Sequence, residues 1–391
     1  MTYKKHNFED GKVLYASALN EMEEQIIKNS GEPEWNFTSD YQSELEKVID
    51  AVKDIQNNNK LHTIEFIMFS DTHRENINDH PEFYRMMQAI NYLTHKLDIK
   101  FVVNLGDNYN GYPVENADYG KGHEGVFEEL VKVLSKLNSP FININGNHDS
   151  VPHIYKRNWI TNLSNAVFDN VGSWFYLDDD FHNIRFIVLD CQDWDGDALN
   201  WTTVSSTKGY ADRSYEQLSW LAHTALKTKK KIVFLQHQSM EETGYYLVHP
   251  TKPTSDGRYY FTTNIIDAFE QGTNGSISYD SNRNIDFDFS SQGQGTVLCN
   301  FSGHTHGDAF YNASYSYPSG FTSSINEIAI DDALCSTGTH AGTANTKTLN
   351  TVNEIVFDVV SIDLLSNIVT CYRFGAGKDR ICTLNGSMTT K

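Results

Sequence analysis

Five apolar stretches of this chain each end in residues that can bind a metal ion, and this repetition limits the available folds most. The central stretch is Phe101–Asn108, which reads as a buried strand of a parallel sheet ending in a sharp turn at Gly106. Asp107 then lies at the carboxyl edge of the sheet, where open α/β folds bind their ligands. The other four stretches end in Asp71-Thr72-His73, Gly146-Asn147-His148-Asp149, His237 and Gly303-His304-Thr305-His306. The pattern predicts one metal site at one edge of a sheet.

Strand and helix patterns alternate from about residue 60 onward, which is typical of a layered α/β fold. We expect strands at 63–70, 101–105, 141–145, 174–177, 184–189, 231–236 and 296–302. Helices are expected around Pro81–Lys96, near 122–137, and after the capping box Ser214-Tyr215-Glu216-Gln217. Residues 354–364 and 368–374 are expected to pair as a C-terminal hairpin.

Four polar stretches rich in Gly, Ser and Asn interrupt this alternation: 192–213, 239–260, 272–295 and 308–324. Long segments without regular structure are usually functional loops. We therefore expect these four stretches to overhang the metal site and to influence which substrate enters it.

Residues 1–58 differ from the rest and predict a helical N-terminal extension, followed by one catalytic domain at 59–391. Ser17 is a candidate cap for a first short helix. A second helix is indicated by apolar residues at helical spacing, namely Leu45, Val48, Ile49, Val52 and Ile55. Two short amphipathic helices cannot form a core alone. They are expected to pack either on the main domain or on another chain.

The overall charge and the cysteines exclude several classes of protein. The formal charge of −20 disfavours attraction to nucleic acid or to an anionic membrane, but not to a phosphate ester held by bound cations. The five cysteines include no Cys-x-x-Cys pair, which argues against a zinc ribbon or a disulfide framework. The chain shows neither a secretory signal nor an apolar run of about 18 residues, so we expect a cytoplasmic protein without a membrane span.

The ordered set of motifs resembles the calcineurin-like metallophosphoesterase family over residues 62–307. The resemblance implies a sandwich of two mixed β-sheets flanked by helices, and two metal ions that share Asp107. It assigns Asp71, His73 and His306 to one ion, and Asn147, His237 and His304 to the other. Carboxylate, amide and imidazole ligands without thiolate suit manganese, iron, zinc or nickel.

The family also implies a reaction, the hydrolysis of a phosphate monoester or diester. A metal-bound hydroxide attacks phosphorus in line with the leaving oxygen, and the residue matching His148 assists the leaving group. Asp149 is a candidate for orienting an imidazole from behind the ligands. Asn108 and Asp308 lie beside ligands in the sequence and are candidates for the same supporting role.

The spacing of the last two histidines raises a geometric question. Residues two apart on a regular strand point to the same face, but His304 and His306 follow the end of a predicted strand, where that regularity is no longer imposed. Gly303 indicates a distorted turn that lets both side chains converge.

Other features allow different interpretations. The basic residues Arg373, Lys378 and Arg380 are expected in a solvated terminal hairpin, with phosphate binding as the alternative. The segment from Phe8 to Ile26 resembles N-terminal stretches of tail and baseplate-associated proteins of Gram-positive phages. The alternative function is therefore a virion attachment protein, in which residues 1–58 assemble with a phage particle or another copy. Its phosphoesterase fold would then serve as a scaffold or cut a phosphodiester polymer of the cell envelope.

Overall fold

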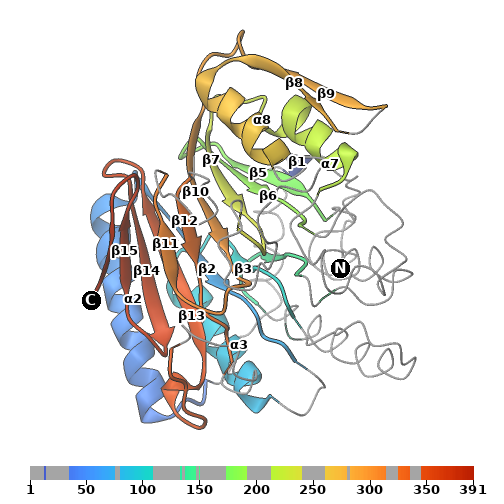
Figure 1. The fold of residues 1–391 in the computed structure, drawn as a ribbon. Coiled ribbons are helices and arrows are strands. Elements are labelled where there is room, and N and C mark those ends of the chain that lie inside the picture. The colour runs from blue at the N-terminus through green and yellow to red at the C-terminus, as the bar shows by residue number, and fades with distance from the viewer. Residues whose placement is uncertain are drawn as a thin grey trace, which may run out of the picture.

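The computed structural model describes residues 13–14, 35–74, 80–108, 133, 137–146, 149, 173–191, 213–239, 260–279, 282–313, 325–334 and 345–391. Over these residues, two seven-stranded mixed sheets pack face to face, with helices on their outer faces (Figure 1). This arrangement confirms the predicted α/β sandwich.

The first sheet has the strand order β16-β15-β14-β13-β2-β3-β4. Its parallel strands are β2 (Thr63–Phe69), β3 (Val102–Asn104) and β4 (Phe141–Asn143). Its antiparallel strands are β13 (Val356–Asp363), β14 (Ile368–Gly375), β15 (Arg380–Thr383) and β16 (Met388–Thr390). Every residue of β2 is buried, as expected for a continuous apolar strand covered on both faces.

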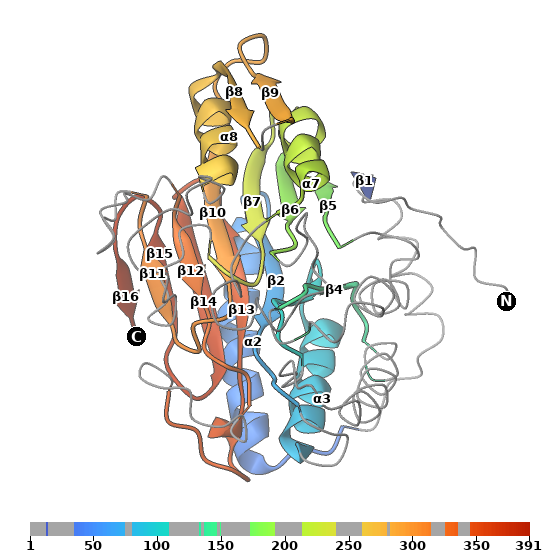
Figure 2. The ribbon, with the colours of Figure 1, turned by 45° about the vertical axis from the view of Figure 1, so that its right-hand side comes forward.

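The second sheet has the order β1-β5-β6-β7-β10-β12-β11. Strands β6 (Ile184–Val188), β7 (Lys231–Leu235), β10 (Thr296–Ser302) and β12 (Glu327–Ala329) are parallel. The others are β1 (Val13–Leu14), β5 (Phe175–Asp179) and β11 (Ala309–Tyr311). Figure 2 shows how β7 and β10 of this sheet face β2 and β13 of the first sheet.

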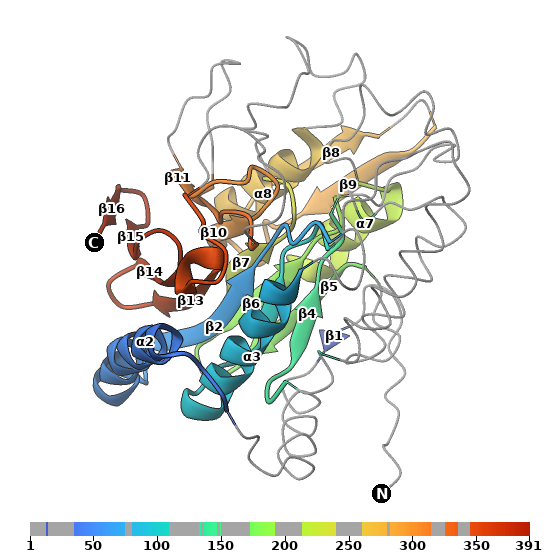
Figure 3. The same ribbon diagram turned by 90° about the horizontal axis from the view of Figure 1, so that it is seen from below.

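Two helices cover the outer face of the first sheet, as the view from below shows (Figure 3). Helix α2 (Ser39–Asn59) is capped at its N-terminus by Thr38, whose side chain accepts a hydrogen bond from the Tyr41 backbone N–H. Helix α3 (Pro81–Lys96) matches its predicted bounds and has proline in its first turn, where no backbone donor is needed. A short 3₁₀ turn, η3 (Val352–Glu354), precedes β13.

Helix α2 shares the main hydrophobic core, although its sequence lies in the predicted N-terminal extension. Its buried residues Leu45, Val48 and Val52 pack with residues of β2, β13 and β14. Val13 and Leu14 pair with Tyr176 and Leu177 at the edge of the second sheet. The rest of the segment that resembles phage proteins lies outside the described residues, so its role in assembly stays a prediction.

The outer face of the second sheet is covered by α7 (Tyr215–Trp220), one π-helical turn η2 (Leu221–Ala225) and α8 (Tyr260–Gln271). The Ser214 side chain caps α7 by accepting from the Gln217 backbone N–H at 3.0 Å. The Gln217 side chain also bonds both backbone groups of Asp190, which ties α7 to the residues that follow β6.

One polar stretch predicted as a loop over the site is a hairpin elsewhere. Residues 272–295 contain β8 (Asn274–Ser278) and β9 (Asn284–Asp288), whose inward residues Ile277, Ile285 and Phe287 pack under α7 and α8. The Lys227 ammonium bonds the Asp288 carbonyl, and Lys227 precedes β7. The hairpin therefore lies near the amino ends of the parallel strands, away from the predicted site, and that prediction is wrong. The stretches 192–212, 240–259 and 314–324 lie outside the described residues.

Across the described ranges, no helix has both the length and the apolar character needed to cross a bilayer. Cys191, Cys299, Cys371 and Cys382 carry buried free thiols, and Cys335 is outside those ranges.

Candidate metal centre

The loops that follow β2 and β3 are joined by backbone hydrogen bonds beyond the ends of their strands. The backbone N–H groups of Asp71, His73 and Arg74 donate to the carbonyls of Gly106, Asp107 and Asn108, over 2.9, 3.0 and 3.2 Å. This pairing fixes two predicted ligands of the first loop beside Asp107 of the second.

Five of the predicted ligands have left-handed backbone conformations, which non-glycine residues rarely adopt. The φ angles are 55° at Asp71, 41° at His73, 53° at Asp107, 67° at His304 and 51° at His306. A left-handed residue breaks the alternation of a strand, so consecutive side chains no longer point to opposite faces. His304 and His306 both reach the site from such left-handed positions, beyond the end of the preceding strand.

Two glycines allow the loops to approach this closely. Gly106 has a φ of 117°, and a Cβ atom there would lie 2.6 Å from Nδ1 of His237. A Cβ atom on Gly303 would collide with the side chains of Ser70 and Asp71. A larger residue at either position would displace a predicted ligand.

The structure brings six predicted ligands into two groups that share Asp107. In the first group, Asp71 Oδ1 lies 3.6 Å from His73 Nε2 and 3.3 Å from His306 Nε2. The two Nε2 atoms of that group are 3.0 Å apart, and Asp107 Oδ2 lies 3.5 Å from His73 Nε2.

The second group adds His237 and His304 to the shared carboxylate. Asp107 Oδ2 lies 3.2 Å from His237 Nε2, and the rings of His237 and His304 are 5.1 Å apart between centroids. The division matches the two ligand sets implied by the family, except that Asn147 lies outside the described residues.

These separations fit a bound cation. Ligand atoms about 2.1 Å from one ion are about 3.0 Å apart in octahedral geometry and about 3.4 Å apart in tetrahedral geometry. The measured distances of 3.0 to 3.6 Å fall near this range. Nitrogen and carboxylate oxygen donors, without a thiolate, are suited to borderline divalent metals.

Hydrogen bonds behind the ligands orient them. His237 Nδ1 lies 2.9 Å from the Leu105 carbonyl, to which it can only donate, so Nε2 is the ring nitrogen that faces Asp107 and is available to a cation. The His304 backbone N–H donates to Asp71 Oδ2 at 2.9 Å and links the two ligand loops. These contacts fix both a tautomer and a carboxylate orientation.

The electrostatics of the site are dominated by its buried carboxylates. Burial opposes the charged form of Asp71, but the imidazoles of His306 and His73 hold the pKa of its carboxyl well below the usual range. Burial lowers the pKa of His237, yet Asp107, Asp71 and Asp149 together outweigh burial and raise it to about 9. Burial and the charge of His237 lower the pKa of His304 to about 3. The carboxylates of Asp71 and Asp107 therefore favour positive charge at the carboxyl edge of the parallel strands.

Asp149 ties the loops after β3 and β4 together. Its carboxylate accepts from the backbone N–H of Asn108 at 2.8 Å, from the Asn108 amide at 3.1 Å and from the Gly146 N–H at 2.8 Å. Burial and the nearby Asp107 charge raise the pKa of Asp149 to about 7. Its predicted role of orienting an imidazole stays a prediction, and His148 lies outside the described residues.

Sequence reasoning missed Asn104, which supports this network from within β3. Its amide donates to Asn108 Oδ1 at 2.5 Å, and its own oxygen accepts from the Gly106 N–H at 3.1 Å. The sequence does carry a signal for Asn104, since it is an asparagine inside an otherwise apolar strand. A buried amide requires hydrogen-bond partners, so such a residue indicates a polar network nearby.

The interpretation of Arg373 and Arg380 as solvated hairpin residues is wrong. Each is 1% exposed, and both bond the buried carboxylate of Asp358. Asp308 accepts a hydrogen bond from Arg373 at 2.6 Å and another from the Asn345 amide at 2.7 Å. Strand pairing placed these basic residues on the inner face, which sequence spacing alone did not reveal.

Comparison with known proteins gives one matching family and a group of distant structural neighbours, among them the two described below. Residues 64–308, well over half of the chain, match the calcineurin-like phosphoesterase family. A search of curated proteins found no sequence match. A dimetal phosphatase from Danio rerio aligns over 82% of this chain and 98% of its own, at 11% identity and a TM-score of 0.45. GAP50, the anchor in the inner membrane complex of Plasmodium, aligns over 84% and 88%, at 13% identity and a TM-score of 0.41.

The family match spans β2 to the turn after β10, which is the part of the chain that supplies every residue of both ligand groups. The chain therefore belongs to the calcineurin-like phosphoesterase family.

Proposed function

We propose that this protein hydrolyses phosphate esters with the help of two divalent cations, of manganese, iron, zinc or nickel. The observation that supports the proposal best is the pair of ligand groups that share Asp107. Two cations a few ångströms apart repel each other, and a shared carboxylate offsets part of that repulsion.

Each ligand has a role in this proposal. Asp71, His73 and His306 hold one cation with Asp107, while Asn147, His237 and His304 hold the other. Bound cations of this kind lower the pKa of a water molecule and offset negative charge on a phosphoryl group. The Leu105 carbonyl keeps the His237 lone pair directed into the site.

His148 is the proposed acid that assists the leaving group. It follows the proposed ligand Asn147 directly and precedes Asp149, whose carboxylate is anchored to Asn108 and Gly146. In this proposal Asn147 binds a cation while the next residue, His148, faces the substrate. The proposed proton moves from the His148 ring to the leaving oxygen as its bond to phosphorus breaks.

The test is hydrolysis of chromogenic phosphate monoesters and diesters by the Mn²⁺-loaded protein, before and after chelation. We expect turnover that chelator abolishes and Mn²⁺ restores. Asp107→Asn is the informative variant, because the loss of the shared charge should remove both cations together with activity. Metal-loaded protein that is inert toward both ester classes would overturn the proposal. Full retention of two cations by Asp107→Asn would contradict the shared role of Asp107.

A further inference from the structure

The space between the two sheets becomes charged toward the metal edge. Arg373 of β14 and Arg380 of β15 both face Asp358 of β13, and all three are 1% exposed or less. Asp358 pairs in register with Met68 of β2, three residues before Asp71. The arginines therefore lie inside the sandwich, close to the strand end that carries a predicted ligand.

The same arginines reach across to the second sheet through Asp308. Arg373 Nη2 donates to Asp308 Oδ1 at 2.6 Å, and Arg380 Nη1 lies 3.1 Å from the same oxygen. Arg380 Nη1 also donates to the Ala329 carbonyl of β12 at 2.5 Å. These contacts join β14 and β15 of one sheet to the residue that precedes β11 and to β12 of the other.

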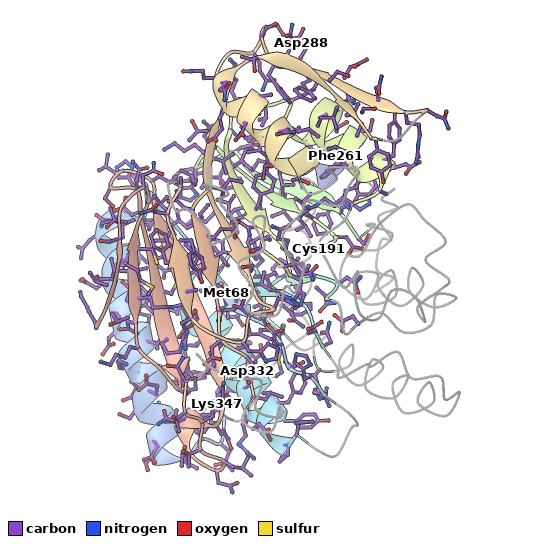
Figure 4. All side chains as sticks on the ribbon, in the orientation of Figure 1. Met68, Cys191, Phe261, Asp288, Asp332 and Lys347 are labelled. Carbon is purple, nitrogen blue, oxygen red and sulfur yellow. The ribbon has the colours of Figure 1, made fainter. Side chains whose placement is uncertain are left out.

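Asp308 is held from its other side as well. Its Oδ2 accepts from the Asn345 amide at 2.7 Å, and its Oδ1 accepts from the Asp331 backbone N–H at 3.3 Å. Lys347 Nζ lies 2.8 Å from Asp332 Oδ1 and 3.4 Å from Asp331 Oδ2, so it extends the same network of charges (Figure 4 labels Asp332 and Lys347). Four groups, from Arg373, Arg380, Asn345 and Asp331, therefore hold the Asp308 carboxylate.

The segment between β10 and Asp308 is short and carries both histidines. His306 is two residues before Asp308. Both histidines have left-handed φ angles, which are unfavourable for non-glycine residues and persist only where surrounding contacts hold the backbone. The start of the segment is fixed by the strand pairing of β10, and its end is fixed by the Asp308 contacts.

We infer that Asp308 is a positioning residue for the metal site, with Arg373 and Arg380 as its buried anchors, and that it keeps His306 directed at Asp71. This inference rests on the proposed function, since it assumes that His306 binds a cation. It follows that weakening the Asp308 anchor should lower cation affinity at the first ligand group, while the second group changes less.

The test is Mn²⁺ titration of the wild type and Asp308→Asn, with stoichiometry and affinity from calorimetry and retained metal after dialysis. Removing a supporting partner of a ligand typically costs about 10- to 100-fold in metal affinity, so we expect a loss of that size at one of two sites. The double variant with His306→Ala should bind no more weakly than His306→Ala alone, because Asp308 acts through that histidine.

Asp178→Asn is a matched control. Asp178 also pairs with a buried arginine, Arg185, and is 15% exposed compared with 16% for Asp308. It lies on β5, however, and should leave both affinities within about twofold. If Asp308→Asn does not fold, Asn345→Ala weakens the same anchor without changing charge and should give a smaller loss at the same site.

The outcomes separate the two proposals. Wild-type protein that binds no Mn²⁺ overturns the proposed function and this inference with it. Wild-type protein with two Mn²⁺ sites, together with an Asp308→Asn variant of unchanged affinity, overturns only the positioning role. Equal losses in Asp308→Asn and Asp178→Asn would also overturn it, since general destabilisation would then explain both.

Discussion

The two proposed cations depend on very few atoms, and Asp107 Oδ2 is central among them. It lies 3.5 Å from His73 Nε2 of one group and 3.2 Å from His237 Nε2 of the other.

The types of ligand residue could be predicted from the sequence because strand ends of a parallel sheet converge. The arginine contacts could not, because a sequence shows the charge of Arg373 but not the strand register that buries it.

His148 supplies the sharpest prediction for a single residue. His148→Ala should bind both cations normally and lose about 10²- to 10⁴-fold in kcat, because a general acid acts mainly in the transition state. The loss should shrink for esters with very acidic leaving groups, which need little protonation. The measurement is kcat against leaving-group pKa, with metal content checked for each variant.

His223→Ala serves as the control for that series, since His223 is exposed and bonds only locally to Ser219 within the described residues. A His148→Ala protein that lacks one cation would identify His148 as a ligand. A loss that is the same for every leaving group would exclude proton transfer.

Among the elements, α2 differs most from the sequence-based expectation of a separate N-terminal extension, because it packs into the main core. Its Tyr41 hydroxyl donates to Glu354 at 2.6 Å, and Arg85 of α3 bonds the same buried carboxylate. Burial raises the pKa of Glu354, but the contacts with Arg85, Tyr41 and the Asn350 backbone together lower it below its usual value. This carboxylate therefore connects α2, α3 and η3.

Leu45→Ala should destabilise the protein by about 3 kcal/mol, because Leu45 is fully buried under the first sheet and its loss leaves a cavity. Leu61→Ala is the control, since Leu61 is 69% exposed just beyond the same helix and should change stability by less than about 0.5 kcal/mol. Urea unfolding checks both. Similar stabilities for the two variants would show that α2 is not part of the cooperative core.

The elements that could be predicted are those with strong periodicity. Helix α3 and the β13–β14 hairpin follow their patterns closely, because continuous apolar spacing leaves few alternatives. The β8–β9 hairpin was missed because its outward residues are Asn, Ser and Asp, which resemble loop composition. Only its packing under α7 and α8 reveals that Ile277 and Phe287 point inward.

For the whole molecule, the buried ion cluster predicts a dependence of stability on pH. Burial raises the pKa of Asp308, but Arg380 and Arg373 outweigh burial and lower it to about 2. A carboxyl group with a lowered pKa stabilises the fold above its unfolded pKa, near 3.9, and that stability is lost as pH falls through the folded value.

Asp308→Asn should therefore be less stable than the wild type by about 2 kcal/mol near pH 6, and the difference should fall to roughly half near pH 3. Chemical denaturation of both proteins at the two pH values measures this difference. A difference that stays constant, or that grows on acidification, would contradict the ionic contribution of Asp308.

The distance in sequence between the two loops of the first ligand group affects how the protein is made. Asp71 and His306 are more than two hundred residues apart, and β2 pairs with β13, which begins only at Val356. A ribosome must therefore synthesise most of the chain before the first group has all its ligands, and more before β2 gains its second neighbour. In the proposed function, the cations of the first ligand group therefore bind only after most of the chain has been made.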